Sequence, residues 1–161
     1  MKLEKNILVI DDQVYMHKIV NLTFTKNGYI YHQANSGKEA IELLNAGLRP
    51  SAILLDLMMP DIDGFEALQT IKKIPALANT PVIILSGKTN EADKISALRA
   101  GAVKFITKPF KPKELFAEVE EAIFGNILEN SVIETEIIEA LKISREKKLK
   151  INARTLIKLT E

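Results

Sequence analysis

Short apolar runs recur along the first 125 residues of the chain, and each is followed by a stretch with helical periodicity. The runs lie at residues 7–10, 52–55 and 82–85, with a weaker one at 103–106 and a more polar one at 29–33. Segments that are apolar on both faces and rich in Ile and Val are typical of central strands in a parallel sheet, which helices cover on both sides. The pattern therefore predicts a parallel sheet, with the polar segment 29–33 at its edge.

Helical patterns occupy the stretches after these runs. Ser36 and Glu39 have the spacing of a capping box, and Gly47, Gly101 and Gly125 mark the expected ends of three helices. The expected helices lie between Ser36 and Gly47 and at residues 14–27, 64–73, 91–100 and 113–124. Alternation of strand and helix five times implies right-handed crossovers. The predicted fold is a doubly wound α/β domain with a five-stranded parallel sheet.

Residues 126–161 form a separate segment with a helical pattern of their own. Spacing at Ser131 and Glu134 suggests a second capping box, and an apolar stripe follows at helical periods. A further short helix is expected at residues 152–159. Thirty-six residues are too few to bury an independent core. We therefore divide the chain into an α/β domain, 1–125, and a helical C-terminal extension, 126–161, that docks on the domain, pairs with another copy or belongs to a longer output domain.

Composition narrows the class of protein. The 161 residues are 47% hydrophobic and 27% charged, with a net charge of +1, which argues against a protein that coats nucleic acid or an anionic membrane. There is no Cys, so thiolate metal sites and disulfides are excluded and a reducing compartment is suitable. No apolar run reaches the roughly 18 residues of a membrane span, and the N-terminus enters a strand-like run at once. We expect a cytoplasmic protein.

Charged and hydroxyl side chains follow four of the predicted strands. They are Asp11 and Asp12 after the first strand, Asp56 after the third, Ser86 after the fourth and Lys108 after the fifth. In open α/β sheets, ligands bind outside the carboxyl ends of the strands, so these groups are expected in one crevice. Three carboxylates without His or Cys favour a hard cation such as Mg²⁺. A metal and a nearby Lys can neutralise a phosphoryl group while a carboxylate attacks it.

Four segments, ILVIDD, LLDLMMPDIDGFE, PVIILSG and GAVKFITKPF, resemble the receiver domain of two-component response regulators over residues 4–124. The resemblance implies a flavodoxin-like sheet of strand order 2-1-3-4-5. It implies that Asp56 is the phospho-acceptor and takes its phosphate from a histidine kinase or phosphotransfer protein. Asp12, Asp56 and the backbone carbonyl of Met58 would hold Mg²⁺, and Asp11 would act through water.

The same resemblance assigns roles to residues outside the acidic cluster. Ser86 and Lys108 would contact the phosphoryl group, Phe105 would be the aromatic switch, and the Lys108–Pro109 bond would be cis. Met58 and Lys88 occupy positions that tune dephosphorylation in the family. The implied function is a switch in signal transduction rather than an enzyme. Its output would pass through protein contacts, including a homodimer formed through a receiver face or the C-terminal helix.

Other interpretations are weaker. Haloacid-dehalogenase-like phosphatases carry a second Asp two residues after the nucleophile, where this chain has Met58. Asp61 and Asp63 are expected in the loop after the acceptor strand, with Asp63 as a helix cap. His17 and His32 lie apart from any cluster and are expected to be structural or surface residues. The basic stretch from Lys142 to Lys158 raises DNA binding as an alternative output, but a solvated helix face explains it better.

Overall fold

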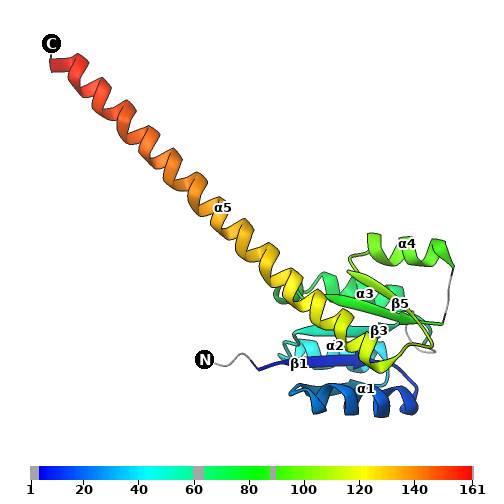
Figure 1. Cartoon of the computed structure of the whole chain (residues 1–161). Coiled ribbons are helices and arrows are strands. Elements are labelled where there is room, and N and C mark those ends of the chain that lie inside the picture. The colour runs from blue at the N-terminus through cyan, green and yellow to red at the C-terminus, as the bar shows by residue number, and fades with distance from the viewer. Residues whose placement is uncertain (1–3, 60–63, 88–89, 161) are drawn as a thin grey trace. The chain divides into compact units, whose positions relative to one another are not determined.

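The computed structural model describes residues 4–59, 64–87 and 90–160, and for residues 126–134 and 148–160 it describes the backbone alone. Strands and helices alternate through the described chain (Figure 1). In order they are β1 Asn6–Ile10, α1 Val14–Lys26, β2 Ile30–Ala34, α2 Gly37–Asn45, β3 Ala52–Asp56, α3 Gly64–Lys72, the 3-10 helix η1 Pro75–Leu77, β4 Val82–Ser86, α4 Glu91–Arg99, β5 Lys104–Thr107 and α5 Pro112–Thr160.

The five strands form one parallel sheet in the order β2-β1-β3-β4-β5. This confirms the doubly wound, flavodoxin-like fold and places the polar strand β2 at an edge. Strands β3 and β4 are buried at every residue, whereas the edge strand β2 is buried only at Ala34. The pattern of apolar runs therefore identified the central strands correctly, because only central strands are covered along their whole length.

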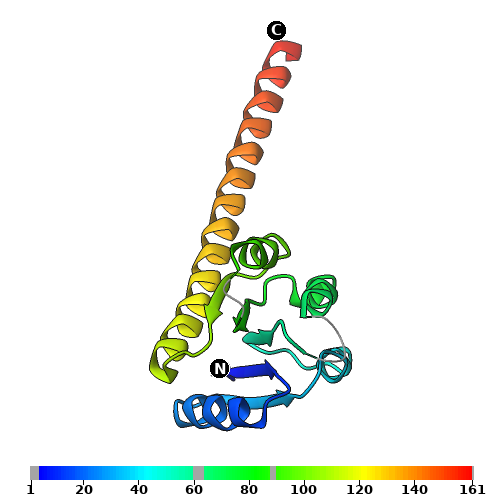
Figure 2. The ribbon, with the colours of Figure 1, turned by 90° about the vertical axis from the view of Figure 1, so that its right-hand side faces the viewer.

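A hydrophobic layer covers each face of the sheet. Ile7 and Val9 of β1 pack with α1 and the first turns of α5, whereas Leu8 and Ile10 of the same strand pack with α2, α3 and α4. Figure 2 shows the sheet between these two sets of helices. Because successive side chains of a strand point to opposite faces, one continuous apolar run supplies both layers.

Local capping signals also match the structure. The Ser36 hydroxyl accepts a hydrogen bond from the Glu39 N–H at 3.1 Å, and the Glu39 carboxylate accepts one from the Asn35 N–H at 2.9 Å. Gly47 and Gly101 have φ angles of +112° and +110° just after α2 and α4. These left-handed conformations end the two helices where the glycines predicted.

The expected end of the last helix at Gly125 is wrong. The helix α5 begins at Pro112 and continues to Thr160, so Ser131 lies inside a helix and residues 152–159 belong to the same element. Positive φ angles among the described residues occur at Gly28, Gly47 and Gly101, and not at Gly125. A glycine within a helix costs only about 1 kcal/mol relative to Ala, and helix-forming neighbours on both sides outweigh that cost.

Packing contacts group the chain into two compact units, Met1–Phe124 and Gly125–Glu161. Each unit is considered by itself below. Within the part of the chain that the structure describes, no helix combines the length and apolar character needed to cross a membrane.

Replacing Gly125 by Ala tests the continuity of α5. We expect the helix to gain about 0.5–1 kcal/mol, because Ala loses less backbone entropy than Gly on becoming helical. A Cβ at this position would meet no atom within 4 Å. Urea unfolding followed by far-ultraviolet circular dichroism measures the effect. Gly47→Ala is the matched control and should destabilise, because Gly47 has a φ of +112° with equally open surroundings; a loss of stability in both variants would contradict a helical Gly125.

Candidate functional site

The residues predicted to form the acidic crevice lie at the carboxyl edge of the sheet. They are Asp11 and Asp12 directly after β1, Asp56 as the last residue of β3, Ser86 as the last residue of β4 and Lys108 directly after β5. The backbone N–H of Lys108 donates to the Ser86 carbonyl at 2.9 Å, which continues the pairing of β4 and β5 past the end of the strand. The parallel register therefore brings together groups that are up to 97 residues apart in the chain.

Lys108 bridges two of the acids. Its Nζ atom lies 2.8 Å from Oδ2 of Asp11 and 3.3 Å from Oδ2 of Asp56. Asp11 and Asp56 are 1% and 5% exposed, so both carboxylates are almost completely removed from water. Charge-assisted hydrogen bonds of this kind compensate part of the cost of burying them.

The third acid, Asp12, lies at the exposed rim of the same cluster. Ligand oxygens of Asp11, Asp12 and Asp56 all lie within 4.8 Å of one another. When the three carboxylates are ionised, the ammonium of Lys108 leaves the cluster with a net charge of 1 − 3 = −2. That charge and an oxygen-only donor set suit a divalent hard cation, so the residues present fit the Mg²⁺ that the receiver family typically binds.

A tight turn after β3 fixes the Asp56 carboxylate. The Met58 N–H donates to Oδ1 of Asp56 at 3.0 Å, and the Gly64 N–H donates to the Leu57 carbonyl at 3.3 Å. A Cβ on Gly64 would lie 2.4 Å from the Leu57 Cα and 2.7 Å from the Asp56 carbonyl oxygen. Glycine is therefore required at position 64, because the start of α3 lies directly against the backbone that carries Asp56.

Burial raises the pKa of Asp56 above its ordinary value. The hydrogen bond from the Met58 N–H and the positive charge of Lys108 lower the pKa, but the negative charge of Asp11 adds to the effect of burial. Loss of hydration thus outweighs the partners that the protein itself supplies. These partners compensate the charge of ionised Asp56 only in part, and a bound cation would favour the charged form.

Phe105 lies on β5, half-buried, next to a groove of about 620 Å³ bounded by α4, β5 and the start of α5. The Nζ atom of Lys94 lies 5.9 Å from the centre of its ring. Ser86 is completely buried at the end of β4, and the Lys108–Pro109 peptide bond is cis, as the resemblance implied. Asp61, Asp63 and Lys88 lie outside the described residues, so the expectations for them stay untested.

His17 is a buried structural residue next to the acidic cluster, a position that the sequence did not predict. His17 was expected to be structural or on the surface, and it is 3% exposed on α1. Its Nε2 atom lies 2.7 Å from the carbonyl oxygen of Asp11, and its Nδ1 atom lies 2.6 Å from the hydroxyl of Tyr31. The available signal was its spacing: a polar residue six positions after Asp11, on the buried face of α1 with Met16 and Val20.

Comparison with known proteins agrees with this geometry. The family model described as response regulator receiver domain matches residues 7–120. A probable transcriptional regulator ycf27 from Porphyridium aerugineum is 35% identical over 137 residues, covering 81% of this chain and 55% of that protein. The ycf27 protein of Guillardia theta is 32% identical over 76% of this chain and 47% of its own length. The chain thus spans about half the length of these curated relatives.

Solved structures show the same likeness. The receiver domain of the Francisella response regulator 1452 superposes with a TM-score of 0.68 at 35% identity, covering 74% of this chain and 97% of that one. The chemotaxis protein CheY4 of Vibrio cholerae gives a TM-score of 0.71 at 26% identity, covering 74% and 99%.

The fold and the acidic edge of the sheet define a doubly wound α/β signalling domain. The chain belongs to the response regulator receiver domain family of two-component systems. Phosphorylation and Mg²⁺ are typical of this family, whose members are signalling switches.

The raised pKa of Asp56 predicts a stability effect that depends on pH. A carboxyl whose pKa is raised on folding destabilises the folded state when it is ionised, and this penalty disappears below its unfolded value of 3.8. Without Mg²⁺, Asp56→Asn should therefore unfold at a higher temperature than wild type at neutral pH, with the difference shrinking as the pH falls towards 4. Thermal unfolding in chelator across this pH range measures it. Glu42→Gln, which removes an exposed carboxyl from α2, is the control; a constant difference between Asp56→Asn and wild type would contradict the raised pKa.

Proposed function

We propose that this chain is a phosphorylation-controlled switch in which Asp56 accepts a phosphoryl group from a histidine kinase or a phosphotransfer protein, with Mg²⁺ as cofactor. The observation that supports it best is the position of Asp56: a buried carboxylate at the end of a fully buried strand, within 4.8 Å of two further acids and 3.3 Å from a Lys. The cysteine-free composition is compatible with a cytoplasmic location.

The proposed transfer is a displacement at phosphorus. A carboxylate oxygen of Asp56 forms the new O–P bond while the N–P bond of the donor phosphohistidine breaks, and the bonding electron pair stays on the imidazole nitrogen. Bound Mg²⁺ would neutralise charge on the carboxylates and on the phosphoryl oxygens. Asp12 and Asp56, with the Met58 carbonyl, would hold it, and Asp11 would act through water.

Lys108 and Ser86 would contact the phosphoryl group once it is on Asp56. Lys108 already lies between Asp11 and Asp56, so a phosphoryl group on Asp56 would offer its ammonium a more strongly charged partner. Ser86, at the end of the neighbouring strand, would hydrogen-bond a phosphoryl oxygen. Phe105, two residues before the end of β5, would then move inward, which changes the groove at α4 and β5 and biases a two-state equilibrium.

The acceptor assignment is tested by mass spectrometry. Incubation with Mg²⁺ and a small acyl phosphate should add one phosphoryl group that is labile to base, and Asp56→Asn should abolish the adduct. Asp61→Asn is the matched control, because it removes a carboxylate only five positions further along the chain, and the adduct should persist. An adduct that survives in Asp56→Asn would remove Asp56 from the role.

The residue two positions after the acceptor bears on the lifetime of the phosphate. Met58 is 53% exposed and carries an apolar side chain. Such a side chain cannot orient an attacking water by hydrogen bonding. We therefore expect the aspartyl-phosphate to hydrolyse slowly.

Self-association through the C-terminal extension is the proposed output. In residues 135–147, whose side chains are described, Ile137, Ile138 and Leu141 are each more than half exposed. At about 100° per residue these three share one helix face, whereas Ile143 lies on the opposite side, about 200° from Leu141. The exposed apolar residues Ile95, Leu98 and Val103, beside the α4–β5 groove, form an alternative surface for a homodimer.

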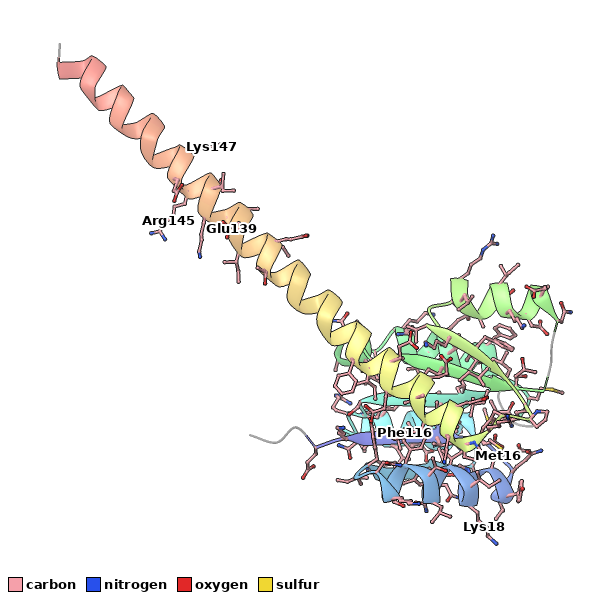
Figure 3. The ribbon with its side chains drawn as sticks, in the orientation of Figure 1. Met16, Lys18, Phe116, Glu139, Arg145 and Lys147 are labelled. Carbon is pink, nitrogen blue, oxygen red and sulfur yellow. The ribbon has the colours of Figure 1, made fainter. Side chains whose placement is uncertain are left out.

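Charge along the extension favours antiparallel pairing of two copies. The acids Glu129, Glu134, Glu136 and Glu139 precede the bases Lys142, Arg145, Lys147, Lys148 and Lys150. Figure 3 labels Glu139, Arg145 and Lys147 along this part of α5. Antiparallel helices would place the acidic half of one copy against the basic half of the other, whereas parallel helices would oppose like charges.

This pairing predicts different effects from two substitutions on the same helix. Leu141→Glu should weaken self-association at least tenfold, because it puts a charge into the apolar stripe. Ile143→Glu, on the opposite side, should leave it nearly unchanged. Analytical ultracentrifugation over a range of protein concentrations compares them. Equal masses for wild type and both variants at every concentration would contradict dimerisation through this stripe.

DNA binding is a second candidate output. The ycf27 relatives are described as probable transcriptional regulators, and the extension is basic after Lys142. The continuity of α5 counts against it, because residues 126–160 contain no turn that could separate the two helices of a helix-turn-helix. Binding to labelled duplex DNA at physiological salt would distinguish the two outputs.

A further inference from the structure

His17 connects the acidic cluster to the edge of the sheet. It is 3% exposed, and both nitrogens of its ring have a hydrogen-bond partner: the Asp11 carbonyl oxygen at 2.7 Å and the Tyr31 hydroxyl at 2.6 Å. Tyr31 belongs to β2, whereas His17 belongs to α1. The side chain therefore joins a helix, an edge strand and the loop that carries the acids.

The partners determine which nitrogen carries the proton. A carbonyl oxygen can only accept a hydrogen bond, so Nε2 is protonated and donates to Asp11. In the neutral ring, Nδ1 then accepts from the Tyr31 hydroxyl. Burial and the negative charge of Asp11 raise the pKa of Tyr31, so this hydroxyl keeps its proton and can act as the donor. Tyr31 thus holds the ring in the tautomer that the Asp11 carbonyl needs.

All four polar groups of Asp11 are held by hydrogen bonds. Its N–H donates to the Ala34 carbonyl at 3.1 Å, and its carboxylate accepts from the Gln13 N–H and from Lys108, each at 2.8 Å. The carbonyl that His17 holds belongs to the planar peptide between Asp11 and Asp12. Holding that oxygen in place therefore fixes the orientation of the peptide plane to which the Cα atom of the exposed Asp12 is attached.

We propose that His17, oriented by Tyr31, is a positioning residue that sets the Asp11–Asp12 peptide so that both carboxylates are placed for Mg²⁺. This inference rests on the proposed function, because it assigns a role to the same acidic cluster. His17 touches neither the ion nor the phosphoryl group. It sets the distance and direction of the Asp12 carboxylate relative to that of Asp56. This geometry decides how tightly the cluster binds a cation.

The experiment measures Mg²⁺ binding directly and the Mg²⁺ dependence of phosphorylation separately. Full-length wild type, His17→Leu, His17→Gln and Tyr31→Phe are titrated with Mg²⁺ alone, followed by amide chemical shifts, and then with a small acyl phosphate at each Mg²⁺ concentration. His32→Gln is the matched control, because His32 bonds the Asn6 side chain at 3.0 Å and does not bond Asp11.

We expect His17→Leu to raise the half-saturating Mg²⁺ concentration about tenfold, as removal of a group that orients metal ligands commonly does, with a near-normal rate at saturating Mg²⁺. Tyr31→Phe should give a smaller increase of the same kind. His17→Gln should recover part of the affinity, because its amide N–H can reach the region that Nε2 occupies. His32→Gln should match wild type.

Several results would overturn the proposal. One is a half-saturating Mg²⁺ concentration equal to that of wild type in His17→Leu, His17→Gln and Tyr31→Phe. Another is a lower phosphorylation rate at saturating Mg²⁺ with unchanged Mg²⁺ affinity, because that result indicates a structural role alone. Should His17→Leu fail to fold, Tyr31→Phe decides alone, since it removes a single oxygen atom. Wild type that neither binds Mg²⁺ nor forms the adduct on Asp56 would refute the proposed function as well, so the two failures are distinguishable.

Discussion

The burial of the Asp56 carboxylate is the constraint on which the site depends. The side chain ends a strand that is buried at every residue, so its charge loses water and must be compensated locally. The protein supplies one N–H and one ammonium group, yet burial still raises the pKa of Asp56, and the negative charge of Asp11 adds to that effect. A carboxylate held in this way is stabilised by any event that brings positive charge close to it, such as the binding of a cation.

The surroundings of the cluster follow from that constraint. Lys108 can bridge Asp11 and Asp56 because β5 delivers it to the edge where β1 and β3 end. Gly64 leaves room for α3 to begin against the backbone of Asp56 and Leu57. His17 holds the Asp11 carbonyl from the helix side. The contacts of Lys108 and His17 thus join the acidic cluster to β5 and to α1.

In the C-terminal unit, the main feature is an apolar stripe that remains exposed. Its described side chains at residues 135–147 are all exposed, and its stripe of Ile137, Ile138 and Leu141 has no cover within its own helix. A single helix cannot bury such a stripe by folding alone. The described part of the same helix carries charges of both signs: Glu136 and Glu139 come before Lys142, Arg145 and Lys147, and Glu146 lies among these bases.

Residue pattern alone was sufficient to predict the strands, most helix ends and the parallel sheet, and it placed Asp11, Asp12, Asp56, Ser86 and Lys108 at one edge of that sheet. These features depend on burial and on the direction in which strands run, and both leave a local trace in the order of residues. Two features could not be found in this way. Gly125 resembles the glycines at 47 and 101, but its conformation is set by the helix on both sides; His17 resembles His32, but only the packing of α1 against β2 brings its ring between Asp11 and Tyr31. Both outcomes depend on neighbours distant in the chain or on cooperative helix formation, which single residue types do not encode.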